Sequence, residues 1–503
     1  MSRTRRRLVL GVLVVSQLLI WIDNTILGNA LETLADPVRG LGATPAELQW
    51  AVGAYTLVFA TLMFTAGALG DRFGHRRVLL AGLAVFGAAS CWAAYAHSPA
   101  ELVAARSVMG AGSAMIMPAT MAAVAWTFPG AERAGAFAAF SSAAGLGVAA
   151  GPVLSGALLG SFWWGSVFLV NAPIVLFGLI GIGLLVPEFR VPAARRLDLI
   201  GLVLSVSGLG LLAYSLIRAG QLAAWTGAEV WGTGLAGLAL LGLFVLVELR
   251  KATPSFDPRL LAGRVFGGGT AAQALLFLAM TAISFVSVFY LQGARGYTPL
   301  QAGLLGLPGA AGVMIGAPIA NVLVRRYAAR VVTSVALGVT GLVMALWSLV
   351  DTSTPIAWLE IMMLVQGLGI GMVIAPVTTV VLGTLPLDRM GAGSAVSNTV
   401  RQTGSVLGIA LVGTVMSIVY RHAMAAWPEA ARVSAEHARH LAAVTHDSGL
   451  LAAADAAFLR SYHVAALWTA GAALAGALLL AVALKPAPAP AVVAAVEEPA
   501  AVH

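Results

Sequence analysis

Long apolar stretches recur along the whole of this 503-residue chain, and they constrain its fold more than any other feature. A run of about 20 apolar residues can cross a lipid bilayer as an α-helix, in which the backbone satisfies its own hydrogen bonds. Hydrophobic residues make up 59% of the sequence and charged residues 10%, whereas soluble domains contain about 25% charged residues. The sequence therefore predicts an all-α polytopic membrane protein.

Fourteen spans are expected from the positions of the apolar runs. They cover residues 8–31, 46–68, 78–96, 99–126, 134–158, 165–186, 197–218, 228–248, 266–291, 301–323, 331–350, 355–383, 391–419 and 463–484. The basic N-terminal head resembles the start of a signal peptide. Its apolar run continues without a small-residue cleavage site at the usual distance, so we interpret it as a retained first span. An even number of spans places both termini on one side.

The basic residues indicate which side that is. With the N-terminus placed in the cytoplasm, 20 of the 29 Arg and Lys residues lie in cytoplasmic segments, seven lie outside, and Arg106 and Arg401 lie within spans. Cytoplasmic loops of membrane proteins are enriched in Arg and Lys. We therefore predict cytoplasmic termini in a bacterial inner membrane. The net charge of +8 then reflects topology, and no nucleic-acid partner is expected.

An internal repeat predicts the domain organisation. The fourth span, SPAELVAARSVMGAGSAMIMPAT, and the twelfth, TPIAWLEIMMLVQGLGIGMVIAPVTT, share a leading hydroxyl residue and proline, a G-x-G and a later proline. We predict two six-helix bundles, at 1–190 and 265–485, with two inserted spans at 191–264. Parallel repeats of this kind are typical of transporters with a central site. Loop 420–462 is expected to form an outer amphipathic helix, and tail 486–503 to be disordered.

The link GALGDRFGHRR between the second and third spans concentrates charge between apolar helices. The residues of interest are Gly67, Gly70, Asp71, Arg72, Gly74, Arg76 and Arg77. Glycines allow close helix approach, Asp71 can face a helix N-terminus, and the arginines can pair with Asp71 or with lipid phosphates. We interpret the link as a clasp of the inner gate. A simple positive-inside anchor is the alternative, which explains the arginines but not Asp71 or the glycines.

Charged residues within spans are costly and therefore functional candidates. Asp23 and Arg106 each lie eight residues from the outer end of a span, which is a depth of about 12 Å at 1.5 Å per residue. They can form a pair that is lost when Asp23 is protonated, or a static pair that only fixes packing. Glu360 either lines a cavity or packs beside Trp358. Arg401 is more often a helix-interface residue than a substrate ligand.

Other polar and aromatic residues within spans are weaker candidates for a substrate cavity. Tyr55 and Tyr290 can receive flat substrates, although core packing is the default interpretation. The remaining candidates are Asn24, Thr25, Asn29, Asn398 and Gln402. The sequence contains no P-loop, paired-carboxylate or nucleophile motif and no ligand-spaced histidine cluster, and its one cysteine, Cys91, lies in an apolar stretch. We expect no enzyme, metal or cofactor.

The motifs together resemble the major facilitator superfamily. GALGDRFGHRRVLLAG resembles its signature loop, LVAARSVMGAGSA its fourth-span motif, and IDNTILGNAL the first-span motif of fourteen-helix drug:proton antiporters. GVAAGPVLSG resembles the antiporter motif, with Gly147, Gly151, Pro152 and Gly156 in place. The resemblance implies two six-helix bundles with two extra central helices. It also implies proton-driven export of amphipathic drugs, antibiotics or antiseptics by a monomer in contact with lipids.

Two departures from the family pattern affect the expected substrates. Gly53 in WAVGAY stands where antiseptic exporters often carry an acid, and Arg401 with Gln402 stands where they carry acids in the thirteenth span. A strict preference for cations is therefore not expected, and the chain is nearer to antibiotic self-resistance exporters. A dedicated exporter of one metabolite or lipid is the alternative. A membrane sensor or scaffold that does not transport is a third, more remote one.

Overall fold

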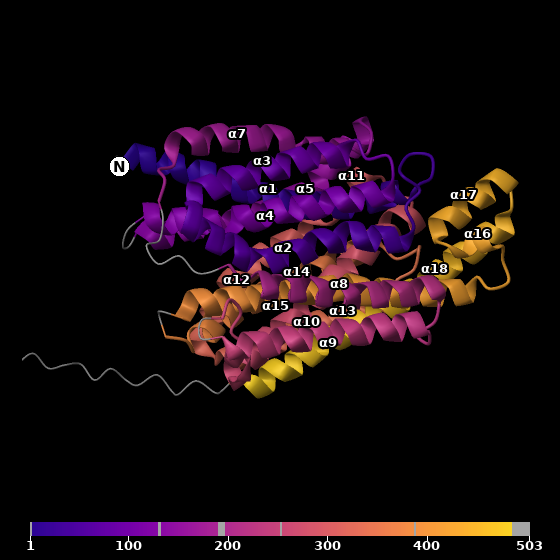
Figure 1. Ribbon diagram of the computed structural model, residues 1–503. Helices are drawn as coiled ribbons and strands as arrows, with labels where there is room; N and C mark the ends of the chain where they lie inside the picture. Colours follow the sequence, from indigo (N-terminus) through magenta and orange to yellow (C-terminus); the bar gives the residue numbers. More distant parts are fainter. Residues whose placement is uncertain (1–2, 129–131, 190–196, 252–253, 387–388, 485–503) are drawn as a thin grey trace, which may run out of the picture.

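The computed structural model describes residues 3–128, 132–189, 197–251, 254–386 and 389–484 as helices with short connections, and no strand occurs among them. The helices run roughly parallel to one long direction (Figure 1). The tail 486–503, expected to be disordered, lies outside the described residues.

Eighteen α-helices follow one another along the described chain. The first group, which we call the N-half, comprises α1 (Arg3–Ala35), α2 (Pro45–Phe73), α3 (His75–Ala94), α4 (Pro99–Thr127), α5 (Glu132–Ser161), α6 (Ser166–Leu169) and α7 (Asn171–Leu185). Two helices follow, α8 (Leu199–Leu222) and α9 (Ala228–Arg250). The last group, the C-half, comprises α10 (Arg264–Val288), α11 (Pro299–Leu305), α12 (Leu307–Arg326), α13 (Ala329–Leu346), α14 (Ile356–Leu382), α15 (Met390–Ala423), α16 (Glu429–Arg432), α17 (Ala435–Thr445) and α18 (Ser448–Ala483).

The spans match the expected ones closely. Thirteen helical segments among the described residues are long and apolar enough to cross a membrane, and α5, at the position of a further expected span, contains the apolar stretch Gly145–Ser161. Most boundaries differ by a few residues, but α18 begins at Ser448, far before the expected start near residue 463. Asp447 accepts a hydrogen bond from the Leu450 N–H at 2.9 Å, and such a cap starts a helix within a polar segment.

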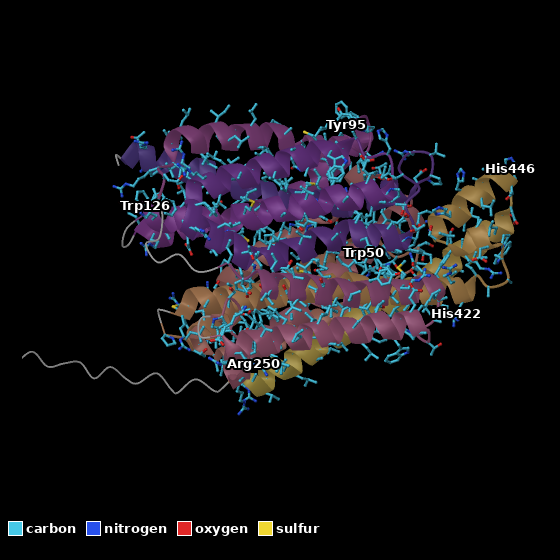
Figure 2. The ribbon with its side chains drawn as sticks, viewed as in Figure 1. Trp50, Tyr95, Trp126, Arg250, His422 and His446 are labelled. Atoms are coloured by element: carbon cyan, nitrogen blue, oxygen red, sulfur yellow. The ribbon has the colours of Figure 1, made fainter. Side chains whose placement is uncertain are left out.

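Successive long helices point in opposite directions, so the bundle has two distinct ends. One end, which we call the amino end, carries the N-terminus, and Trp126 and Arg250 lie there (Figure 2). The other, the cap end, carries α16 and α17 (Figure 1), and Tyr95, His422 and His446 lie towards it (Figure 2). This alternation is the arrangement that a polytopic bundle requires.

The two halves meet along a few helices. In the N-half, α4 packs against α2 and α3, and α1 packs against α5 and α7. In the C-half, α12 packs against α14, and α10 against α15 and α18. Contacts between the halves are made mainly by α2 with α15 and by α5 with α11. The inserted α8 packs on both α2 and α15 and therefore covers one side of this junction, with α9 outside it.

Candidate functional site

A buried ion pair lies in the N-half. The Arg106 Nη1 atom of α4 lies 2.6 Å from the Asp23 Oδ2 atom of α1, and the two side chains are 1% and 0% exposed. The two residues were predicted to lie at the same depth, and the structure places them in direct contact. A buried charge is costly unless it is paired, and in this pair each side chain lies in direct contact with the opposite charge.

The pair is fixed by polar groups from two other helices. Asn171 at the start of α7 donates from Nδ2 to Asp23 Oδ1 at 3.1 Å and to Ser90 Oγ of α3 at 3.0 Å. The Arg106 Nε donates to the Ala51 carbonyl of α2 at 3.3 Å. Sequence reasoning missed Asn171, although an amide within an otherwise apolar stretch is a signal that could have identified it.

Tyr55 covers the other side of Arg106. The guanidinium carbon lies 4.2 Å from the centroid of the Tyr55 ring, and the Tyr55 hydroxyl lies 2.7 Å from Ser113 Oγ. Asn24, which is exposed, donates to the same hydroxyl at 3.4 Å. Tyr55 is itself buried, so it separates the ion pair from the accessible surface at Asn24 and offers no open ring face to a substrate.

The glycines of the antiporter motif allow α5 to lie directly against its neighbours. A Cβ atom at Gly147 or Gly151 would collide with Trp21 or Thr25 of α1, and one at Gly156 would collide with the Leu300 backbone of α11. Thr25 also donates to the Gly147 carbonyl at 3.2 Å. The motif therefore joins α1 and α5 and extends the contact to the C-half at the cap end.

Asn29 links the halves at that end. Its Nδ2 donates to the carbonyls of Pro152 at 3.1 Å and Pro299 at 2.9 Å. Gln292, in the π-turn η2 (Phe289–Ala294), donates from Nε2 to the Asn29 carbonyl and to Asn29 Oδ1, both at 2.8 Å. Gln292 was not predicted. The buried Asn29 thus bonds three segments, two of them in the opposite half.

A second link at the cap end involves α17. Arg439 lies 2.9 Å from Asp455 of α18, 3.7 Å from Glu436, and 4.0 Å from Glu32 of α1. Burial opposes its charged form, but the carboxylates of Glu436, Glu32 and Asp455 outweigh burial and hold the pKa of Arg439 above its ordinary value. The amphipathic helix expected within 420–462 therefore holds a cation against the N-half.

At the amino end, the link between α2 and α3 is bonded within the N-half. Asp71 Oδ1 lies 3.1 Å from His75 Nε2. The backbone N–H of Arg76 donates to Glu188 at 3.2 Å, and Arg77 Nε lies 3.6 Å from the same carboxylate. The expected pairing of the arginines with Asp71 is therefore wrong for this structure. Glu188, which follows α7 and was not predicted, is the acid that the Arg76 backbone and the Arg77 side chain contact.

The three glycines of this link have different roles. Gly74 has a φ of 103° and caps α2 by donating to the Gly70 carbonyl at 2.9 Å. Gly70 leaves room for the His75 ring, into which a Cβ would project. A Cβ at Gly67 would meet open space, so the prediction of a close approach there is wrong. The guanidinium carbon of Arg72 lies 5.5 Å from the centroid of the neighbouring Phe73 ring.

Comparisons with known proteins agree with this architecture. The family model described as Major Facilitator Superfamily matches residues 13–409. The multidrug efflux pump LfrA of Mycolicibacterium smegmatis is 34% identical, over 96% of this chain and 97% of its own. A puromycin resistance protein of Streptomyces alboniger is 33% identical, over 82% of each chain. A bacterial homolog of the human lysosomal transporter Spinster has the same fold, with a TM-score of 0.68, 15% identity and 98% and 100% coverage.

The chain belongs to the Major Facilitator Superfamily. Members of this superfamily are transporters, and among the described residues no group of three or more His, Cys, Asp or Glu side chains is arranged to hold a metal ion. The methyl viologen resistance protein SmvA of Salmonella typhimurium is another relative, 33% identical over 82% of this chain and 83% of its own.

In this facilitator, Arg401 and its neighbours lie on the C-half side of the junction. Arg401 of α15 donates from Nη2 to Asn398 Oδ1 at 2.9 Å, and Asn398 Nδ2 donates to the Met63 sulfur of α2 at 3.2 Å. Gln402 beside it is half-buried. Asn398 and Arg401, one turn apart on α15, therefore lie beside a contact between the halves that Asn398 makes with Met63.

Two other cavity candidates of this facilitator lie elsewhere. Tyr290 is completely buried, stacks on Tyr462 at 5.1 Å and donates to the Asp351 carbonyl at 2.8 Å. Core packing encloses the ring, so in this conformation the default interpretation holds and Tyr290 is not available to flat substrates. Glu360 is half-buried in the first turns of α14, near the exposed Trp358, and bonds to none of the described residues. This position favours the interpretation that Glu360 packs near the membrane surface over the interpretation that it lines a cavity.

Proposed function

We propose that this protein is a proton-coupled antiporter that exports amphipathic drugs, antibiotics or antiseptics across the bacterial cytoplasmic membrane by alternating access. The relatives named as multidrug, methyl viologen and puromycin resistance proteins support export of such compounds. The excess of Arg and Lys at the amino end supports a cytoplasmic position for that end and for both termini. The cap end then faces outwards.

The buried pair of Asp23 and Arg106 is the observation that supports proton coupling. Protonation of Asp23 would leave the Arg106 charge buried without its partner, a state that costs several kcal/mol. A rearrangement that relieves this cost couples proton binding to a change of conformation. One proton that enters the cell supplies about 2.3 kcal/mol per 100 mV of membrane potential.

Alternating access requires the contacts at the cap end to open. In this structure the halves are joined there by hydrogen bonds of Asn29 with Gln292 and Pro299. At the other end, the described ion pairs of the α2–α3 link remain within the N-half. These contacts support a conformation that is closed on the outer side, and we assign the bonds of Asn29 and Arg439 to the outer gate.

Transport by purified protein in proteoliposomes tests this function. An imposed inward-directed proton gradient should drive efflux of compounds from a panel of cationic dyes and neutral antibiotics, and an uncoupler should stop it. Energised efflux without proton movement would contradict the coupling. Absence of efflux and of counterflow for every compound would instead favour a sensor that does not transport.

A dedicated exporter of one secondary metabolite is the second candidate. It is favoured by a relative named as a probable actinorhodin transporter of Streptomyces coelicolor, 31% identical over 82% of this chain. The same panel separates the two functions, because a dedicated exporter would transport only close analogues of one compound.

A further inference from the structure

Arg401 is a cation within the membrane part of this protein, and the described residues supply no counter-ion for it. Arg401 lies eleven residues after the start of α15 at Met390, which is about 17 Å along the helix and near the middle of a bilayer core of about 30 Å. No carboxylate among the described residues forms an ion pair with it. Its Nε is buried without an acceptor, and its hydrogen bond to Asn398 is to a neutral amide.

Arg401 lies beside a contact between the two halves. The guanidinium carbon lies 5.4 Å from the centroid of the Phe277 ring of α10. Asn398, to which it is bonded, contacts Met63 of α2, a helix of the other half. Arg401 is only half-buried, so part of its side chain remains accessible. A charge, an aromatic face and a flexible thioether therefore occur together at the junction.

The energetic state of this cation differs from that of Arg106. Burial of a charge is tolerated where an opposite charge compensates it, and an amide oxygen supplies only a partial dipole. Guanidinium is well suited to bind a carboxylate, because its planar donors match the two oxygens. An anionic group that binds Arg401 would therefore form the ion pair that no carboxylate among the described residues forms with it.

We propose that Arg401 binds an anionic group, such as a carboxylate, of the exported substrate, while Phe277 and Met63 contact its apolar part. This inference rests on the proposed export function and assigns acidic amphiphiles to its substrate range. It also implies that the membrane potential acts on the substrate directly. The interior of the cell is negative, so the membrane potential favours the exit of an anion and adds to the contribution of the entering proton.

A matched pair of probes tests this inference. Pyrenebutanoate and its uncharged carboxamide have the same flat apolar body and differ in the charged group. In proteoliposomes, Arg401→Gln should lower energised efflux of the carboxylate about tenfold or more, which corresponds to the loss of one charge-assisted hydrogen bond. Efflux of the carboxamide should change less than about twofold. Arg325→Gln, at an exposed arginine of the same half, is the control variant and should affect neither probe.

Two further measurements keep the test decisive. Arg401→Lys keeps the charge but loses the planar donors, so it should lower carboxylate efflux about threefold and spare the carboxamide, even if the glutamine variant does not fold. A potassium diffusion potential that is negative on the substrate side should accelerate efflux of the carboxylate more than that of the carboxamide.

The opposite results have distinct meanings. Equal losses for both probes would show that Arg401 only packs helices, and unchanged carboxylate efflux in both variants would exclude it as a ligand. A wild-type protein that exports cationic or neutral compounds but not the carboxylate would also overturn the inference. A wild-type protein that exports no compound at all would instead overturn the proposed function.

Discussion

The two halves of this protein hold their charges differently. In the N-half, Arg106 is paired with Asp23 at 2.6 Å, and Arg77 lies 3.6 Å from Glu188. In the C-half, Arg401 has no carboxylate partner among the described residues. The segment NVLVRRYAARVV of this half resembles the α2–α3 link, and its Arg325, at the position of Asp71, is exposed. Related helical bundles therefore carry a compensated charge in one half and an uncompensated charge in the other.

We propose that this difference reflects a division of labour. An acid that is paired and buried can exchange its charge for a proton, which suits the N-half for energy coupling. A cation without a partner changes the affinity for charged ligands, which suits the C-half for substrate selection. The predictions below test this division, beginning with the change expected to have the largest effect.

Removal of the titratable acid should abolish coupling. Asp23→Asn keeps the shape of the side chain but cannot carry a negative charge, so energised efflux should fall to the level of empty liposomes, with no substrate-induced proton movement. Glu132→Gln, which removes an acid on the surface that pairs with Arg6, is the control and should leave efflux unchanged. Normal efflux and proton movement by Asp23→Asn would remove this residue from the coupling mechanism.

Loss of the amide beside the pair should have the next largest effect. Asn171→Leu removes the hydrogen bond to Asp23, and a bond to a charged group contributes about 1.5–3 kcal/mol. We expect energised efflux to fall about tenfold, while passive counterflow of substrate falls less. Equal losses in both assays would mean that Asn171 supports only the packing of α7.

Loss of the acid in the α2–α3 link should lower the rate of efflux more than the affinity for substrate. Asp71→Asn weakens the contact with His75, so efflux should fall about threefold to tenfold with little change in substrate affinity. Arg325→Gln, the corresponding position of the C-half, should change neither quantity. Cysteines introduced at the amino ends of the two halves would report a changed population of open and closed conformations as altered crosslinking. An identical crosslinking pattern and rate would leave the link as a positive-inside anchor.

The contacts of Arg439 should have the smallest effect. Glu32→Gln removes an acid 4.0 Å from Arg439, and a pair at this distance contributes about 1 kcal/mol or less. We expect efflux to change less than about threefold, with greater labelling of cysteines placed at the cap end. Decreased labelling would show that this contact does not hold the outer side closed.

Depth along each helix follows from the sequence. The apolar runs predicted the spans, the basic residues predicted the orientation, and a rise of 1.5 Å per residue placed Asp23 and Arg106 at one depth, where the structure pairs them. The start of the last span was expected near residue 463, but α18 begins at Ser448. Hydropathy indicates where the membrane begins, whereas the cap at Asp447 determines where the helix begins.

The tertiary structure alone decided which side of each helix points towards which neighbouring helix. Asn171, Glu188 and Gln292 complete the network around Asp23, the α2–α3 link and the contacts of Asn29, and none was predicted. The same limit applies to Tyr290, for which the sequence allowed a substrate contact beside core packing, and the structure shows core packing. The physical reason is geometric. A sequence determines how far a residue lies along its helix, but its partners depend on how each helix is rotated about its axis and on which helices become neighbours, and packing of the whole bundle determines both.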